Sequence, residues 1–255
     1  MLRVIKLLLY YFAYNLGVTA VVTGIWMAFN GFQFPTESGA ATELSIYVLI
    51  LANIAYGLHL VWGRYCELNH TTLSPVSVSV MTVSVVLILA MGCWSNYMLE
   101  ALEVPDTMKE LFEVMLDNPW GIFAIALLAP VFEEILFRGA IQGYLMKKWT
   151  NPWWGIVVAS LIFGAIHGNP VQIPFAFITG LVLGWVYYRT GSLLPGIVMH
   201  FVNNSFSVVL FHFTRNEADT TMVGLLGETG AVTLAVIGFA VTIACVWYIA
   251  KKEVL

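Results

Sequence analysis

The segment PWGIFAIALLAPVFEEILFRGAIQGYL, residues 119–145, decides how this chain is interpreted. It is long enough for a membrane-spanning helix, which needs about 20 mostly apolar residues. Its only charged residues are Glu133, Glu134 and Arg138. A charge near the middle of a membrane helix costs about 2.5–3.5 kcal/mol on insertion scales, so such residues are candidates for a functional site. The segment therefore predicts a membrane helix that carries a site.

The composition extends this interpretation to the whole chain. Of the 255 residues, 60% are hydrophobic and 10% are charged, whereas soluble domains have about 25% charged residues. An ordinary soluble enzyme is therefore excluded. The net charge of −4 comes from scattered residues, so we expect no nucleic acid as a partner. The three cysteines lack the CxxC spacing of disulfide or thiolate metal sites, and we interpret them as packing residues: Cys66, Cys93 and Cys245.

Further apolar stretches lie on both sides of this segment. Residues 153–188 carry no charge, and as one helix they would be about 54 Å long at about 1.5 Å per residue, nearly twice the thickness of the hydrocarbon core. This stretch must break, and we predict the break at Gly168-Asn169-Pro170. We predict an all-α, polytopic integral membrane protein, a single membrane domain over residues 1–255 with about eight transmembrane helices, near 5–29, 44–63, 75–99, 119–145, 153–168, 171–188, 192–214 and 229–250.

The basic residues fall mostly on one side of this arrangement. With the N-terminus in the cytoplasm, eight of the eleven Lys and Arg residues lie at cytoplasmic helix ends, Lys109 and Arg215 lie outside, and Arg138 lies within a span. Cytoplasmic loops are enriched in Lys and Arg, so we predict that both termini are cytoplasmic. On the opposite side, residues 104–118 have the apolar spacing of an amphipathic interfacial helix.

Polar residues gather in the later spans, and their spacing suggests roles. Glu134 and Arg138 stand at i and i+4, which favours an ion pair on one helix face. Glu133 is rotated by about 100° from Glu134 and needs a polar partner from another helix, for which His167 and His200 are the candidates. His200 and Asn204, also at i and i+4, could present two donors to one oxyanion. Asn203, at i+3, is the weaker alternative.

At these residues the sequence resembles a known family, the CPBP (CAAX protease and bacteriocin-processing, or Abi) intramembrane proteases, which include the type II CAAX prenyl endopeptidases. The matching pieces are EEILFRG at 133–139, FGAIH at 163–167, GSLLP at 191–195 and HFVNN at 200–204. Each motif is unspecific alone, but the ordered set is highly specific. The resemblance places a catalytic core at residues 119–210.

The resemblance implies an intramembrane endopeptidase that hydrolyses a peptide bond of a membrane-associated peptide or protein, lipidated or membrane-embedded. Glu133 would be the general base that activates water, with His167 assisting. His200 and Asn204 would stabilise the oxyanion, and Glu134 and Arg138 would support the site. We expect a bacterial cytoplasmic membrane protein, with the endoplasmic reticulum membrane as the alternative.

Three alternatives stay open. A proton-coupled transporter would also bury Glu, His and Arg near the midplane, although here the polar residues sit in spans four to seven alone. A catalytically silent membrane scaffold of the same fold is the second. The third is a zinc-dependent variant, because Glu133, His167 and His200 could supply one oxygen and two nitrogens. The chain lacks the HExxH pair that fixes two imidazoles on one helix, so we expect no metal cofactor.

Overall fold

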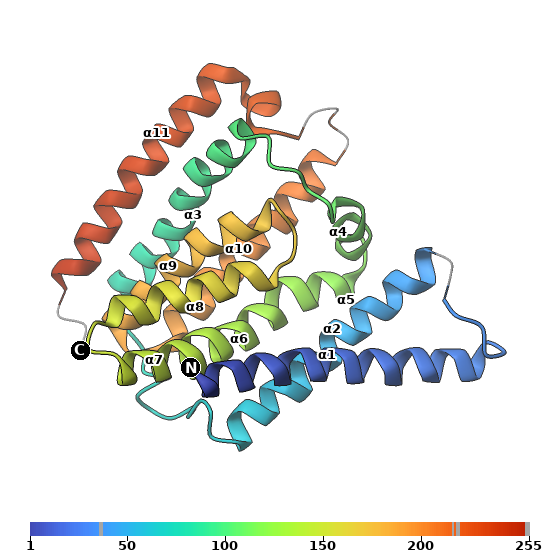
Figure 1. Ribbon diagram of the computed structural model, residues 1–255. Coiled ribbons are helices and arrows are strands. Elements are labelled where there is room, and N and C mark those ends of the chain that lie inside the picture. Colours follow the sequence, from blue (N-terminus) through green and yellow to red (C-terminus); the bar gives the residue numbers. More distant parts are fainter. Residues whose placement is uncertain (36–37, 216, 218–219, 253–255) are drawn as a thin grey trace.

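The computed structural model describes residues 1–35, 38–215, 217 and 220–252, and these form helices joined by short connections (Figure 1). No strand occurs among them, as the sequence predicts. The helices, two of which are π-helices labelled η, are α1 (Leu2–Phe29), α2 (Ser38–Trp62), α3 (Val78–Ala101), α4 (Lys109–Leu116), α5 (Pro119–Ile122), η1 (Phe123–Leu128), α6 (Ala129–Glu134), η2 (Ile135–Gln142), α7 (Gly143–Lys148), α8 (Pro152–Ile166), α9 (Gln172–Thr190), α10 (Leu193–Thr214) and α11 (Met222–Lys251).

Two of the helix starts use the same local sequence, Asn-Pro-Trp. At α5 the side chain of Asn118 accepts a hydrogen bond from the backbone N–H of Trp120 at 2.9 Å, and at α8 Asn151 does the same for Trp153 at 3.0 Å. Asparagine is a preferred N-cap. Proline fits the first helical position, because its missing N–H would have no partner there. These caps begin the helices on both sides of the predicted site.

Each predicted span coincides with a helix, but six helices among the described residues, not eight, are long and apolar enough to cross a membrane. They are α1, α2, α3, the continuous segment Pro119–Lys148, α10 and α11. The other two are α8 and α9, and α8 has only 15 residues, about 22 Å at 1.5 Å per residue. The predicted break is confirmed, since α8 ends at Ile166, α9 begins at Gln172 and Gly168 between them has φ of +67°, a conformation that glycine adopts readily.

The segment Pro119–Lys148 is not the uniform α-helix that the sequence predicts. It contains two π-helical stretches, η1 and η2, on either side of α6. A π-helical turn shifts the register of hydrogen bonds by one residue and is frequent at functional sites. Glu133 and Glu134 are the last residues of α6, so both carboxylates lie where the register changes.

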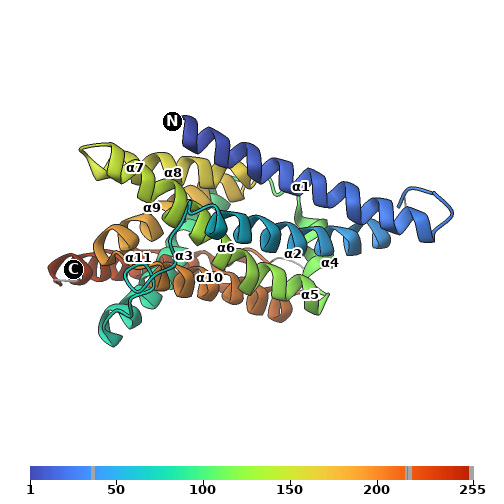
Figure 2. The same cartoon turned by 90° about the horizontal axis from the view of Figure 1, so that it is seen from below.

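Two pairs of helices lie on opposite sides of the central helices. On one side α11 packs along α3, and on the other α1 packs against α2, as Figures 1 and 2 show. The start of α1, the end of α11 and α7 lie at the same end in both views. This end carries most of the basic residues assigned to the cytoplasm. The side of the membrane that it faces stays a prediction.

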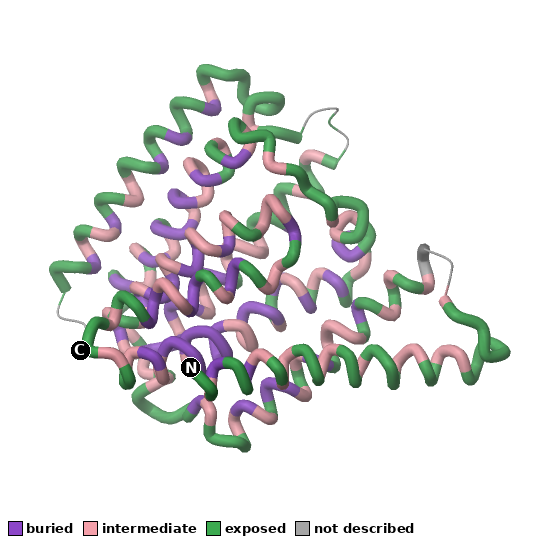
Figure 3. The backbone as a smooth tube through the Cα atoms, viewed as in Figure 1, coloured by how far each residue is buried: buried purple, intermediate pink, exposed green. Residues whose placement is uncertain are grey.

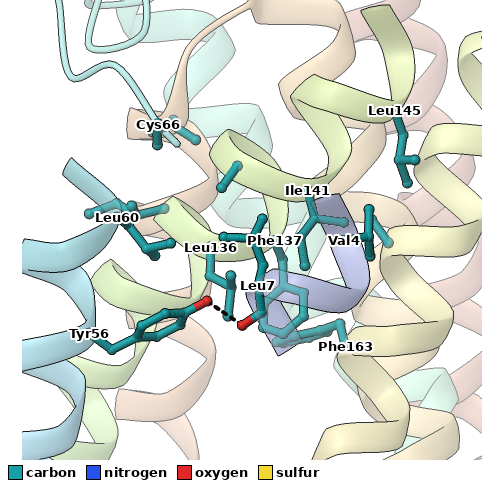
Figure 4. Packing of buried hydrophobic residues seen from close by; sticks show 14 of the residues in the cluster. Val4, Leu7, Tyr56, Leu60, Cys66, Leu136, Phe137, Ile141, Leu145 and Phe163 are labelled. Carbon is teal, nitrogen blue, oxygen red and sulfur yellow. Dashed lines mark hydrogen bonds between the residues drawn. The ribbon is translucent and has the colours of Figure 1, made fainter. Parts of the chain in front are cut away.

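Burial is concentrated at η2 and the helices beside it, while the far half of α1 is exposed (Figure 3). One core cluster joins Val4 and Leu7 of α1 to Phe137 of η2 and Phe163 of α8 (Figure 4). The hydroxyl of Tyr56 in α2 donates to the backbone oxygen of Leu7 at 2.7 Å. The first two helices are therefore attached to the helix that carries the predicted site.

Candidate active site

The ion pair predicted between Glu134 and Arg138 is confirmed. Nη1 of Arg138 lies 3.2 Å from Oε1 of Glu134, and the two side chains are 2% and 0% exposed. Nη2 of Arg138 also donates to the backbone oxygen of Gly180 in α9 at 3.4 Å. Buried charges are tolerated when they are paired and hydrogen-bonded. Glu134 is thus a buried carboxylate whose charge is compensated by Arg138, although its Oε2 and Nη1 of Arg138 have no hydrogen-bond partner.

Glu133, the neighbouring carboxylate, has a different environment. Its side chain is 22% exposed, and its Oε2 lies 3.7 Å from Nε2 of His200 in α10. The sequence predicts that Glu133 has a polar partner on another helix, and this partner is His200. Of the two adjacent carboxylates, Glu133 is the one that a water molecule and a substrate can reach.

His200 lies between the two carboxylates. Its Nδ1 is 3.2 Å from Oε1 of Glu134, while its Nε2 faces Glu133. A carboxylate that is paired with a guanidinium can only accept, so the Nδ1–H of His200 is the donor in this contact. Glu134 therefore fixes the orientation of the His200 ring, a role that its spacing from Arg138 alone does not reveal.

His167 is held by its own helix. Its Nδ1 lies 2.7 Å from the backbone oxygen of Phe163, one turn earlier. A carbonyl oxygen can only accept, so Nδ1 carries the hydrogen and Nε2 of the neutral ring is an acceptor. The local backbone thus selects the tautomer that can accept a hydrogen bond from water.

Phe163 is the apolar centre of the site. Its ring packs edge to face against His167, with centroids 4.9 Å apart, and against His200, at 5.7 Å. The guanidinium carbon of Arg138 lies 4.6 Å from its centroid, within the range of a cation–π interaction. The buried Phe163 side chain therefore joins the three motifs in one cluster.

Asn204 lies one turn after His200 on α10 and has an unexpected partner. Its amide donates to the backbone oxygen of Ile125 in η1 at 2.9 Å, and its Oδ1 accepts from Asn203 at 3.2 Å. One of its two N–H groups is therefore used to join α10 to the first π-helix. The other makes no hydrogen bond to the described residues.

Two further residues beside the site were not expected from the sequence. A Cβ atom added at Gly196 would lie 2.8 Å from Oε2 of Glu134, so the absence of a side chain lets α10 approach this carboxylate. The spacing of Gly196 from His200, i and i+4, could have revealed it. Asn169, completely buried, donates to Asp106 at 2.8 Å and thereby attaches the segment before α4 to the turn beside His167.

The zinc alternative depends on whether its three possible ligands lie together. Among the described residues, no group of three or more His, Cys, Asp and Glu side chains is arranged to hold a metal ion. Nδ1 of His167 and Nδ1 of His200 each make a hydrogen bond, which leaves Nε2 of each ring, the nitrogen that a zinc-ligating histidine would also present. The absence of a metal cofactor therefore stays a prediction.

Comparisons with known proteins find similarity in the region that contains these site residues. Residues 115–206 match the family model described as type II CAAX prenyl endopeptidase Rce1-like. The chain is 30% identical over 121 residues to the membrane-embedded CAAX protease MroQ of Staphylococcus aureus, covering 46% of this chain and 49% of MroQ. It is 28% identical over 105 residues to YdiL of Bacillus subtilis, which is named as a candidate membrane peptidase. This match covers 41% of this chain and 43% of YdiL.

A third relative is an uncharacterized 24.3 kDa protein of Escherichia coli, 33% identical over 107 residues, which are 39% of this chain and 49% of that protein. The chain spans about half the length of these curated relatives. No solved structure matches. The resemblance noted from the motifs is therefore confirmed, and it is a resemblance of residues 115–206, the segment that holds every predicted site residue, to the type II CAAX prenyl endopeptidases.

Proposed function

We propose that this protein is an intramembrane endopeptidase in which Glu133 is the general base. The observation that carries the proposal is the contrast between the two adjacent carboxylates. Glu134 is buried in an ion pair with Arg138, whereas Glu133 is partly exposed and faces His200. A carboxylate that is free of a permanent cation and open to water is suited to proton transfer.

In the proposed reaction, Glu133 accepts a proton from water while the water oxygen attacks the carbonyl carbon of the peptide bond. The carbonyl oxygen becomes an oxyanion in the tetrahedral intermediate. Protonated Glu133 then gives the proton to the leaving nitrogen as the C–N bond breaks. Nε2 of His167 accepts a hydrogen bond from the second O–H of the attacking water and so orients it, because the tautomer imposed by the oxygen of Phe163 leaves this nitrogen as an acceptor. This second hydrogen stays on the oxygen that becomes part of the product carboxyl group.

The oxyanion is assigned to the free N–H of Asn204 and to Nε2 of His200. Since Nδ1 of His200 already donates to Glu134, Nε2 can donate only when the ring is doubly protonated. Glu134 then acts as a positioning residue that holds the His200 ring, while the nearby carboxylate of Glu133 faces the charged imidazole. Donors aimed at a developing oxyanion are commonly worth a factor of about 100–1000 in kcat.

The substrate class follows from where the site lies. The carboxylates are on a helix that is apolar enough to cross the membrane, so we propose a membrane-associated peptide or protein, lipidated or embedded, as the substrate. The bacterial relatives support a bacterial cytoplasmic membrane as the location. The proposed catalytic core is residues 119–210 of one membrane domain.

The experiment compares membranes of cells that express wild type or Glu133→Gln, with Glu110→Gln as control. Glu110 is an exposed carboxylate of α4. New peptide N-termini are labelled chemically and identified by mass spectrometry. We expect termini that require wild type or Glu110→Gln and are missing with Glu133→Gln. Identical sets of termini from all three proteins would contradict the proposal and favour a transporter or a silent scaffold.

A further inference from the structure

Cations and tyrosines alternate along the end of the molecule that holds the start of α1. Lys148 lies 5.9 Å from the ring centre of Tyr144, and Arg3 lies 5.0 Å from the same ring and 5.3 Å from that of Tyr65. Lys6 is beside Tyr65 and 5.4 Å from the centre of Tyr10. We call these six residues from α1, α7 and the connection after α2 the cation–tyrosine row.

The positive charges of this row have no anionic partner in the part of the chain that the structure describes. None of the ion pairs of the described residues includes Arg3, Lys6 or Lys148. Arg3 and Lys6 stand at i and i+3 on α1, where like charges repel. Nη2 of Arg3 donates to the backbone oxygen of Tyr65 at 2.9 Å, and its Nε has no hydrogen-bond partner. The row therefore has the electrostatics of an anion site.

A groove begins beside this row. It lies between α1 and α2, has a volume of about 320 Å³ and is lined by Tyr14, Ala55, Leu58, His59, Trp62 and Gly63. His59 joins the groove to the row, since its ring lies 4.8 Å from that of Tyr10 and 5.7 Å from that of Tyr65. Apart from Tyr14 and His59 the lining side chains are apolar, so the groove suits a hydrocarbon chain with an anionic head at its mouth.

The surroundings place the row at the boundary between lipid and water. Trp62, which lines the groove, is 77% exposed, and Trp153 and Trp154, just beyond α7, are 51% and 62% exposed. Exposed tryptophan and tyrosine mark the membrane interface. Leu2 and Leu9 on α1 are 84% and 63% exposed, which provides an apolar surface next to the basic residues.

We propose that the cation–tyrosine row and this groove form a binding site for an anionic phospholipid. The lipid phosphate is held by Lys6 and Arg3 with the hydroxyl of Tyr65, and one acyl chain lies between α1 and α2. In the predicted topology this lipid belongs to the cytoplasmic leaflet. The proposal is independent of the proteolytic function. The groove and the phosphate-binding residues Arg3, Lys6 and Tyr65 lie outside the matched region 115–206, whereas Tyr144 and Lys148 of the row lie within it.

The test measures lipid retention by native mass spectrometry of the purified full chain in a neutral detergent. The probes are phosphatidylglycerol and phosphatidylcholine with identical acyl chains. We expect phosphatidylglycerol to be retained preferentially. Lys6→Gln, a change at an exposed position, should weaken its binding about fivefold, as expected for one cation near an anionic headgroup.

Two further variants make the test specific. Lys251→Gln removes an exposed lysine at the same end of the molecule, 3.9 Å from the ring centre of Trp247, and should leave retention unchanged. Ala55→Leu narrows the groove without altering charge and should weaken retention of phosphatidylglycerol. Equal retention of the two lipids, or equal losses with Lys6→Gln and Lys251→Gln, would overturn the proposal in favour of general surface attraction. Full retention by Ala55→Leu would overturn the placement of the acyl chain.

Discussion

Replacement of Arg138 by alanine tests the buried ion pair on which the site depends. The guanidinium lies 3.2 Å from Glu134, donates to the oxygen of Gly180 and packs over Phe163. Removing it leaves the carboxylate of Glu134 uncompensated at 0% exposure. Breaking a buried pair in this way costs about 3–5 kcal/mol, a large part of the 5–15 kcal/mol that stabilises a typical protein.

A matched control exists at the other end of the molecule. Arg215 and Asp117 also form an ion pair, with Nη1 2.8 Å from Oδ1, but their side chains are 44% and 47% exposed. An exposed pair contributes about 0–1 kcal/mol. Arg215→Ala should therefore change the free energy of unfolding by no more than this, although its ion pair is shorter than that of Arg138.

The assay is reversible unfolding in mixed micelles by titration with sodium dodecyl sulfate, followed by tryptophan fluorescence. Arg138→Ala should lower the free energy of unfolding several times more than Arg215→Ala. The double replacement Glu134→Leu/Arg138→Met should recover most of the loss, because a buried pair can often be exchanged for apolar residues without destabilisation, but it should remain inactive. Equal effects of the two single variants would refute the assignment of a buried, essential pair.

Three further predictions concern packing, metal dependence and topology. Gly196→Ala should destabilise the protein by about 1–3 kcal/mol because its Cβ would lie 2.8 Å from Oε2 of Glu134. Gly17→Ala in the interior of α1, which meets no atom within 4 Å, should not destabilise the protein in the same titration, since alanine is favoured over glycine in a helix. Activity should survive treatment with a strong zinc chelator. If the chelator abolished activity and stoichiometric zinc restored it, Glu133, His167 and His200 would be reassigned as zinc ligands. In a background without native cysteines, Lys109→Cys and Lys252→Cys should react with a membrane-impermeant maleimide from opposite sides, and labelling of both from one side would contradict the eight-span topology.

The sequence predicts the helices well where composition alone decides them. The break at Gly168-Asn169-Pro170 followed from length, because no single helix of residues 153–188 fits the bilayer. The two π-helical stretches could not be predicted from the sequence. Both stretches pack against α10 and α2, and such contacts between helices are not encoded in a local pattern of residues. Whether the 15-residue helix α8 crosses the membrane stays a prediction, because apolar composition does not distinguish lipid contact from burial against other helices.

For the site, spacing within one helix was informative and contacts between helices were not. The pair of Glu134 and Arg138 could be predicted from i and i+4, and it is present. The contact between Nδ1 of His200 and Glu134 joins residues 66 positions apart, so no local pattern encodes it. The same holds for the hydrogen bond from Asn204 to Ile125, 79 positions away.

The most direct test of the central claim is the hydrolysis rate of Glu133→Gln on a substrate found in the membrane comparison. The amide keeps the shape of the side chain but cannot take a proton from water. Measured with purified protein, kcat should fall by a factor of about 100–10,000, while the unfolding midpoint in sodium dodecyl sulfate stays that of wild type. A folded Glu133→Gln protein that turns over at the wild-type rate would contradict the assignment of Glu133 as the general base.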